Sequence, residues 1–347
     1  MYAGMREIQN IKDMAGVVRR IAYIPHEDMG NAYTDRMREI LSNLGVVYRF
    51  PGLRRLFKGW PHSLGHYDLV FINWLENAIV DADSGRIDWR AVFKLFAKTL
   101  LIKAFARRLV FIRHNNYPHD TAAGSEQVAQ RLIDAYEHLF DRVITHSGAA
   151  AGRRYYCPHP LYQAIDSAAA YAHPEDLPAG YFLVFGRIQP YKKIDALLAA
   201  WPVEQTLVVA GSVGDAAYAR RLSVLQGAHF IFRPGRLEEV DAQRMMRAAR
   251  GVVIANAEAD VVVSGTFFYA MSLGCPVYAV ASPFLLWARE RLGSELLVLG
   301  NNLNELCQLI ADARPPATPV SAAALEAIQR EFGDMAVLSA LTAVTTD

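Results

Sequence analysis

Short apolar runs alternate with longer amphipathic stretches along most of the chain, and this alternation restricts the possible folds more than any other feature. Continuous apolar strands separated by helices are typical of a parallel sheet that is covered on both faces. The strands expected in the first half are Arg20–Ile24, Val46–Phe50, Leu69–Asn73, Leu109–Arg113 and Arg142–Thr145. Those expected in the second half are Phe182–Gly186, Thr206–Ala210, His229–Phe232, Gly251–Ala255, Val277–Val280 and Leu296–Leu299.

The chain is long enough for two domains. Its 347 residues exceed what one compact core usually holds. A stretch rich in Pro and Ala, Cys157–Tyr181, reads as the linker between two separate alternations. We therefore expect an α/β protein with two doubly wound Rossmann-like domains, 1–160 and 161–347, that face a central cleft, with C-terminal helices in the second domain.

Composition excludes several classes of protein. A hydrophobic fraction of 52% and a charged fraction of 20% are typical of a well-packed protein. The three cysteines are too few and too far apart for a disulfide framework or a CxxC metal site. The N-terminal stretch has charges where a signal peptide needs apolar residues, which favours a cytoplasmic protein. With a net charge of +1 and no basic-aromatic platform, a nucleic-acid partner is not expected.

Three loops of the second domain carry groups that suit a diphosphate. Each follows an expected strand, and at such carboxyl ends glycine turns and helix N-termini favour anions. Arg187 and Lys192 can converge on an anion there, whereas Lys193 is expected only to solvate a helix face. The candidate donor-binding residues in this half are Gly186, Arg187, Lys192, Gly211, Ser264, Gly265 and Thr266.

The first domain offers candidates for acid–base chemistry, again in loops after expected strands. They are Gly30, in the loop after the first strand, and the candidate catalytic residues Glu76, His114, His119 and Asp120. His146 and His159 are expected to be structural, and no spacing of His, Asp or Glu indicates a metal site.

Two motifs of the second half resemble known glycosyltransferases. "FGRIQPYKKIDALLAAW" and "AMSLGCPVYA" are similar to the phosphate-binding signature and the following helix and turn of GT-B glycosyltransferases of family 4, over roughly residues 181–300. Two glutamates of that family are replaced here by Val261 and Tyr269. This departure makes the family 4 mode of ribose and sugar binding a poor match.

A second resemblance spans most of the chain. "GRIQPYKKI", "SGTFFYAMSLGCPV", "FINWLEN" and "RHNNYPHD" resemble glycosyltransferase family 94, the xanthan-pathway β-mannosyltransferase type. The resemblance implies GDP-mannose as donor, a lipid-diphosphate-linked oligosaccharide as acceptor, inversion at the anomeric carbon and a role in exopolysaccharide assembly. It also implies that Ser264-Gly265-Thr266 holds the diphosphate and ribose, and that His114 contacts the donor sugar.

Inverting transfer needs a base for the acceptor hydroxyl and positive charge for the leaving diphosphate. Asp120 is our first candidate for the base, followed by Glu76, with His119 as a further possibility. Arg187 and Lys192 supply the charge, and no metal ion or other cofactor is expected. Three alternatives stay open: a retaining family 4-like transferase that uses a UDP-sugar, a GT-B sugar-nucleotide epimerase, and a non-catalytic sugar-nucleotide binder.

The first half has features of a membrane-surface protein. Residues 1–160 carry 22 Lys and Arg against 16 Asp and Glu. Two segments, Leu53–Pro61 and Val92–Phe111, interleave cations with large apolar residues, as segments that rest on anionic bilayers do. We expect a helix over Trp89–Arg108, on which Lys94, Lys98 and Arg108 would share one face. Lys103 and Arg107 would lie nearly opposite, so either the helix breaks near Thr99 or part of it belongs to the core with snorkelling lysines. The expected location is the inner face of the cell membrane, with an anionic membrane surface as a partner.

Overall fold

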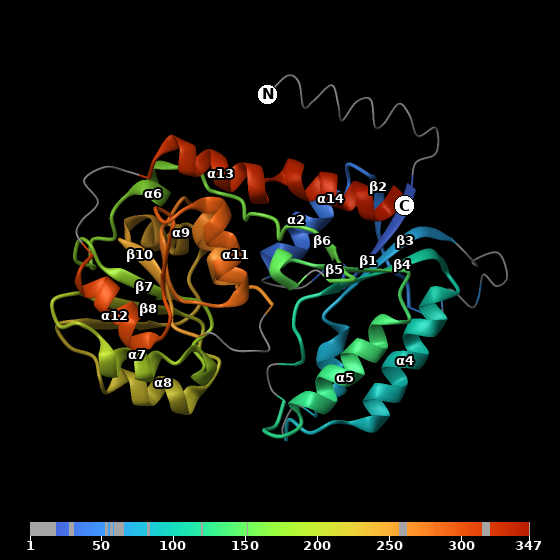
Figure 1. The fold of residues 1–347 in the computed structure, drawn as a ribbon, viewed down its shortest axis with the longest axis horizontal. Coiled ribbons are helices and arrows are strands. Elements are labelled where there is room, and N and C mark those ends of the chain that lie inside the picture. The colour runs from blue at the N-terminus through green and yellow to red at the C-terminus, as the bar shows by residue number, and fades with distance from the viewer. Residues whose placement is uncertain are drawn as a thin grey trace. The chain divides into compact units, whose positions relative to one another are not determined.

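The computed structural model describes residues 19–27, 31–52, 55, 58, 66–81, 84–118, 121–150, 152–256, 262–313 and 320–346. The chain forms two compact units (Figure 1). Unit 1 holds the described residues up to Pro160, together with Val262, Val263 and the segment from Asp334 onward. Unit 2 holds the described residues from Leu161 to Gly333 apart from Val262 and Val263.

Unit 1 is built on a six-stranded parallel sheet. Its strands are β1 (Arg19–Ile24), β2 (Gly45–Arg49), β3 (Tyr67–Asn73), β4 (Ala106–Arg113), β5 (Arg142–Thr145) and β6 (Tyr155–Tyr156). They lie in the order β2-β1-β3-β4-β5-β6. The five strands expected from the sequence are confirmed, and the two-residue β6 is too short for a sequence pattern to indicate.

Helices cover both faces of this sheet. They are α2 (Ala32–Leu41), α4 (Trp89–Lys103), α5 (Glu126–Glu137) and α14 (Asp334–Thr346), with short 3-10 turns η1 (Leu75–Ile79) and η2 (Gly148–Ala150). Side chains of α4 and α5 share one apolar core with β3 and β4. Figure 1 shows α4 and α5 side by side on that face and α2 with α14 on the other.

The helix that begins at Trp89 is shorter than the sequence predicted. It ends at Lys103, and Ala106–Arg108 belong to β4, where they pair with the start of β3. The expected end at Arg108 is therefore wrong. Pairing with the sheet satisfies these backbone groups and ends the helix before the apolar strand begins.

Unit 2 contains a second six-stranded parallel sheet. Its strands are β7 (Phe182–Phe185), β8 (Leu207–Gly211), β9 (Phe230–Pro234), β10 (Gly251–Ile254), β11 (Val277–Val280) and β12 (Leu297–Gly300). All six expected strands are confirmed, in the order β12-β11-β10-β7-β8-β9. The order reverses between β7 and β10, and ligands of doubly wound sheets bind at such a switch point, beyond the carboxyl ends of the strands.

Helices flank the second sheet as well. They are α6 (Ala168–Tyr171), α7 (Ile194–Ala200), α8 (Ala216–Ser223), α9 (Glu239–Ala248), α10 (Gly265–Ser272), α11 (Pro283–Leu292), α12 (Leu303–Ala311) and α13 (Ala322–Phe332), with the 3-10 turn η3 (Pro190–Lys192). Side chains of α7, α8 and α12 pack with β7, β8 and β9 in one core. The three cysteines are buried free thiols.

The last helix, α14, belongs to unit 1 and not to the second domain in which the sequence placed it. The guanidinium of Arg19 donates to the Thr345 hydroxyl over 2.9 Å, and that of Arg108 donates to the Thr345 carbonyl over 3.1 Å. Arg36 on α2 pairs with Asp334. These partners lie some 240 to 330 residues apart in the chain, so no local pattern could predict the packing.

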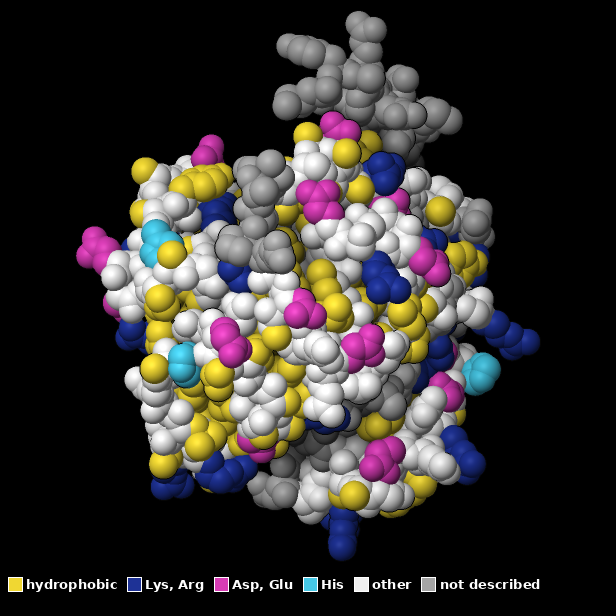
Figure 2. Space-filling model, turned by 60° about the vertical axis from the view of Figure 1, so that its left-hand side comes forward, with side chains coloured by type: hydrophobic (Ala, Val, Ile, Leu, Met, Phe, Trp, Pro, Cys, Tyr) yellow, Lys and Arg dark blue, Asp and Glu magenta, His cyan; other side chains and the backbone are white. Residues whose placement is uncertain are grey.

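One face of the molecule mixes charges of both signs. On the face in Figure 2, basic and acidic side chains lie interspersed among apolar and uncharged ones. This pattern differs from the continuous basic face that is typical of nucleic-acid-binding domains. None of the described helices is both long enough and apolar enough to cross a bilayer.

Candidate functional site

The candidate donor site of unit 2 lies where the loops after β7 and β10 leave the sheet. Two hydrogen-bond donors from different segments converge on the carbonyl oxygen of Phe185, the last residue of β7. The ammonium group of Lys192 donates to it over 2.7 Å, and the hydroxyl of Thr266 donates to it over 3.3 Å. The sequence prediction that the Gly186–Lys192 loop and the Ser264–Thr266 loop come together is thus confirmed.

Gly186 makes this convergence possible. Its φ of 108° lies in a region that favours glycine. A Cβ atom at this position would stand 3.0 Å from the Lys192 Nζ atom and 3.6 Å from the Thr266 hydroxyl. The missing side chain leaves room for the ammonium group beside the start of α10.

In the part of the chain that the structure describes, Lys192 has no carboxylate partner. Its ammonium group donates to a neutral carbonyl, that of Phe185. Burial lowers the pKa of Lys192 to about 8, because removing water disfavours the charged form. The ammonium is still mostly protonated at pH 7, so the site offers a partly desolvated cation that an anion would stabilise.

The two hydroxyls at the start of α10 also make hydrogen bonds within the protein. Ser264 is the N-cap residue and accepts from the Phe267 N–H over 3.4 Å. Thr266 uses its proton on Phe185. The N–H groups of Gly265 and Thr266 stand in the first helical turn, where an α-helix supplies no acceptor, and they remain suited to an anion.

Gly211 allows a close approach of two backbone segments. A Cβ atom there would lie 2.1 Å from the Gly186 carbonyl oxygen, and its φ is 140°. The loops after β7 and β8 stay paired beyond the strands, since the Ile188 N–H donates to the Ser212 carbonyl over 2.8 Å. Gly211 therefore holds the Gly186 loop in place.

Arg187 lies on the β8 side of its loop. The side chain is exposed, and its Nε atom would stand 2.7 Å from a Cβ atom built on Gly214. Gly214 thus leaves space for this guanidinium. The structure places Lys192 beside the start of α10 and Arg187 over the loop that follows β8, so the two cations do not share one carbonyl.

The sequence did not indicate one group near this site, the pair formed by Tyr269 and Glu239. Tyr269 occupies the position of a family 4 glutamate, and its hydroxyl donates to the Glu239 carboxylate over 2.6 Å. Its ring stacks on that of Phe185, with centroids 5.4 Å apart and planes within 9°. The carboxylate comes from α9, thirty residues earlier, and no local motif links the two positions.

In unit 1, His114 follows the carboxyl end of β4 and is buried against aromatic rings. The Asn73 amide donates to the Ile24 carbonyl, so its oxygen is the acceptor that faces His114 Nε2 at 3.0 Å. His114 therefore carries its proton on Nε2, and Nδ1 is left as an acceptor. Burial, reinforced by His146 and His159, lowers the pKa of His114 well below its usual value, so the ring is neutral at pH 7.

The backbone before Glu76 is fixed by the same histidine. Trp74 has a φ of 51°, which is uncommon for a large residue, and its indole stacks on His114 with centroids 4.4 Å apart. The turn η1 begins directly afterwards and contains Glu76, whose side chain lies outside the described residues. Gly30, His119 and Asp120 also lie outside them.

His146 and His159 are buried among rings around Tyr33. His146 Nδ1 donates to the Cys157 carbonyl, and its Nε2 accepts from the Tyr33 hydroxyl, both over 2.8 Å. Burial lowers the pKa of His146 to about 4. His159 Nδ1 donates to the Pro160 carbonyl over 2.7 Å. These bonds give both imidazoles a structural role.

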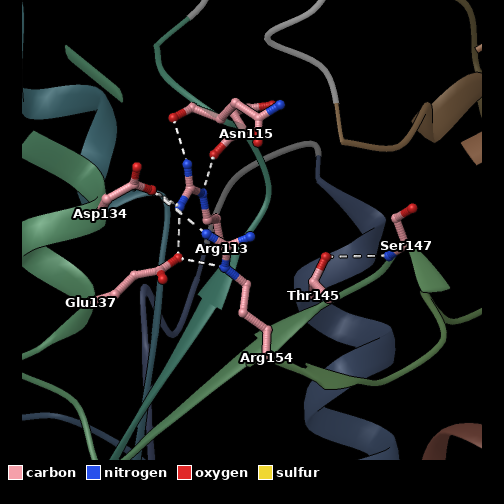
Figure 3. Close-up of polar contacts among 8 residues, drawn as sticks. Arg113, Asn115, Asp134, Glu137, Thr145, Ser147 and Arg154 are labelled. Carbon is pink, nitrogen blue, oxygen red and sulfur yellow. Dashed lines mark hydrogen bonds and ion pairs between the residues drawn. The ribbon is translucent and has the colours of Figure 1, made fainter. Parts of the chain in front are cut away.

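Arg113 anchors the loop that carries His114 (Figure 3). Its buried guanidinium bonds Asp134 and Glu137 of α5, each over 2.7 Å, and also donates to the carbonyls of Asn115 and Asn116. Arg154 shares Glu137 over 2.8 Å. The loop after β4 is thereby tied to α5 through one buried cation.

The described residues contain no group of three or more His, Cys, Asp or Glu that could hold a metal ion. No model of a protein family and no curated protein sequence matches the chain.

Solved structures match nearly the whole chain. HepE of Anabaena in complex with UDP is 14% identical, with a TM-score of 0.62 over 94% of this chain and 99% of that one. Its complex with UDP-glucose is 16% identical, with a TM-score of 0.62 over 95% of this chain and 100% of that one. Sucrose-phosphate synthase from Thermosynechococcus elongatus is 18% identical, with a TM-score of 0.64 over 94% of this chain and 98% of that one. The two sheets and these neighbours define the fold as GT-B, as the sequence predicted.

The Arg113 network yields a stability prediction. We expect Arg113→Ala to lower the free energy of unfolding by about 3 kcal/mol, because the carbonyls of Asn115 and Asn116 lose their buried donor and Glu137 keeps only Arg154. Arg107→Ala is the matched control on the same strand: its guanidinium is 74% exposed and pairs with Asp68 at 3.2 Å, which is worth less than about 1 kcal/mol. Urea denaturation measures both, and equal losses would contradict the anchoring role.

Proposed function

We propose that the protein is a glycosyltransferase that binds a nucleoside-diphosphate sugar through unit 2. The observation that carries this proposal is the partly desolvated ammonium of Lys192 beside Gly186 and the first turn of α10, at the switch point of a GT-B fold. The UDP and UDP-glucose complexes of HepE support it, because that neighbour binds a donor of the proposed class.

The proposed chemistry is a displacement at the anomeric carbon. The acceptor hydroxyl loses its proton to a base and forms the new C–O bond, while the bond to the diphosphate breaks and its electron pair leaves with the diphosphate. Positive charge that is already in place lowers the free energy of that leaving group in the transition state. Lys192 and the α10 N–H groups take this role, with Arg187 as an outer cation.

The finer identity of the reaction follows the motif resemblance. GDP-mannose is the proposed donor, with inversion, and a lipid-diphosphate-linked oligosaccharide of exopolysaccharide assembly is the proposed acceptor. A UDP-sugar is the alternative donor that the HepE complexes favour. Thermal-shift measurements with GDP, UDP, ADP and dTDP separate the two, and transfer of radiolabelled sugar to an acceptor separates a transferase from an epimerase or a non-catalytic binder.

Lys192 should make nucleotide binding dependent on pH. Its pKa of about 8 means that the free site loses its charge as pH rises through that value, while the diphosphate is already fully ionised above pH 7. We expect the affinity for the nucleoside diphosphate to fall between pH 7 and pH 10. Lys192→Arg should bind with a flat profile, since guanidinium stays charged, and Lys192→Ala should lose about 10–100-fold at pH 7.

Isothermal titration calorimetry measures these affinities, with Lys193→Ala as the control. Lys193 is exposed and adjacent, and its substitution should leave the affinity unchanged. A wild-type profile as flat as that of Lys192→Arg would argue against the assignment of Lys192 to the diphosphate.

The base remains proposed as Asp120, with Glu76 and His119 next. His114 is neutral and its Nδ1 atom is an acceptor, which suits a hydrogen bond from a hydroxyl of the donor sugar better than proton removal. We expect Asp120→Asn to slow transfer by about 10²–10⁴-fold while nucleotide affinity is kept. Steady-state rates of Asp120→Asn, Glu76→Gln and His119→Gln are compared. If Asp120→Asn keeps its rate and one of the other two variants is slowed, the residue replaced in that variant is the base.

The membrane proposal concerns the exposed face of α4. Trp89, Phe93 and Leu100 are 62%, 75% and 54% exposed, and they fall within an arc of about 40° on a helical wheel. The opposite face of the helix is buried in the core. Exposed cations flank the apolar stripe on one side; they are Arg90, Lys94 and Lys98.

An apolar stripe beside a row of cations matches the surface of an anionic bilayer. The end of α4 at Lys103 removes Arg107 and Arg108 from the helix, while Lys103 stays on it, opposite Lys94, and pairs with Asp141 at 3.0 Å. The other expected segment, Leu53–Pro61, lies largely outside the described residues. We propose that α4 holds unit 1 on the membrane where a lipid-linked acceptor would be found.

Liposome sedimentation tests this proposal. We expect Trp89→Ser/Phe93→Ser/Leu100→Ser to lower the partition onto phosphatidylserine-containing vesicles by at least about tenfold, because large apolar side chains no longer enter the interface. Val224→Ser/Leu225→Ser is the control, since these residues are 83% and 55% exposed on unit 2. Equal vesicle binding by the two variants would exclude membrane docking through α4. So would a triple α4 variant that binds vesicles like the wild type and differs from it only by converting a dimer to a monomer in light scattering.

A further inference from the structure

A carboxylate is held near the candidate donor site by side chains of two helices. Glu239 is the first residue of α9, and its Oε1 atom accepts from the Tyr269 hydroxyl over 2.6 Å and from the Gln243 amide over 2.9 Å. Two donors on one oxygen fix the position of the carboxylate more firmly than the exposed end of a helix would by itself.

Gln243 is itself fixed. It is fully buried, its Nε2 atom also donates to the Gln163 carbonyl over 2.9 Å, and its Oε1 atom accepts from the Ile165 N–H over 2.8 Å. The amide thus uses both of its protons and cannot turn away from Glu239 without losing a buried bond. The Glu239 side chain is nevertheless exposed, and in the described part of the chain no donor is found on its Oε2 atom.

Tyr269 connects this carboxylate to the diphosphate site. It lies four residues after Gly265 on α10, so it stands on the same face, about 6 Å farther along the helix. Its ring is stacked on Phe185, whose carbonyl receives Lys192 and Thr266. A molecule with its diphosphate at the start of α10 therefore has this carboxylate beside its next group.

The chemistry of a carboxylate limits what that next group can be. An ionised carboxylate only accepts hydrogen bonds and repels phosphate, so its ligand must be a hydrogen-bond donor and cannot be an anion. In a nucleoside diphosphate the group next to the diphosphate is a ribose, whose 2′- and 3′-hydroxyls form a neighbouring pair of donors. Resting on the proposed function, we infer that Glu239 binds the ribose hydroxyls of the donor nucleotide, with Tyr269 as its positioning residue.

A structural role for Glu239 makes a different prediction. An acidic side chain in the first turn of α9 stabilises the helix through its dipole and would do so without contact with any nucleotide. Replacing Glu239 would then change the melting temperature and affect every nucleotide equally. Discrimination between ribose and deoxyribose is a property that such a role cannot produce.

Calorimetric titrations with UDP and 2′-deoxy-UDP, and with GDP and 2′-deoxy-GDP, test the inference on the full chain. We expect the wild type to prefer the ribonucleotide by about tenfold, the effect of one charge-assisted hydrogen bond. Glu239→Gln should lose most of that preference while keeping its affinity for the deoxynucleotide. Tyr269→Phe should reduce the preference in part, because the carboxylate remains but loses one of its two fixed donors.

Glu238→Gln is the matched control. Glu238 is the preceding residue, is exposed, and makes no side-chain capping bond, so its replacement should leave the preference unchanged. Thermal unfolding of each variant monitors the fold.

Three results would overturn the inference. A wild type that binds ribose and deoxyribose nucleotides equally, or a Glu239→Gln variant that keeps the wild-type preference or weakens both nucleotides alike, would remove Glu239 from the ribose site and leave the proposed function standing. A wild type that binds no nucleoside diphosphate at all would overturn the proposed function itself.

Discussion

The carbonyl oxygen of Phe185 is the point on which the candidate donor site depends. It receives one donor from the loop after β7 and another from the start of α10, so it joins two segments that are 80 residues apart in the chain. Gly186 and Gly211 allow that convergence, because side chains at either position would crowd the ammonium of Lys192 or the neighbouring backbone. The sheet order supplies the rest, since it brings β7 and β10 together.

The two units each use a largely buried cation, but in opposite ways. Arg113 in unit 1 meets two carboxylates and two carbonyls, so its charge is compensated within the fold. Lys192 in unit 2 donates to a neutral carbonyl, and its pKa falls to about 8 as a result of burial. The first arrangement is suited to holding a loop, and the second is suited to an anion that arrives from outside, because a bound anion would relieve the cost of desolvation.

The sequence was sufficient for the features that depend on local pattern. Continuous apolar runs located eleven strands, and the glycine, lysine and helix-start positions after β7 and β10 indicated two loops that do lie together. Features that depend on partners far away in the chain could not be predicted in this way. The bond from the Thr266 hydroxyl to the Phe185 carbonyl arises only in the folded sheet, because the two residues are 81 positions apart.

The substitution at position 269 illustrates the same limit and has a physical consequence. From the sequence, a tyrosine in place of a family 4 glutamate reads as the loss of a negative charge. In three dimensions the phenol donates to Glu239, so a carboxylate is present but stands on α9, beyond the ring. A carboxylate directly on α10 would repel an anion at the start of that helix more strongly and would partly cancel the positive charge of Lys192, since the Coulomb energy of two charges falls as their separation grows. The tyrosine thus places the negative charge farther from the candidate anion site. Its hydroxyl contacts the carboxylate, and its ring stacks on Phe185, whose carbonyl receives Lys192.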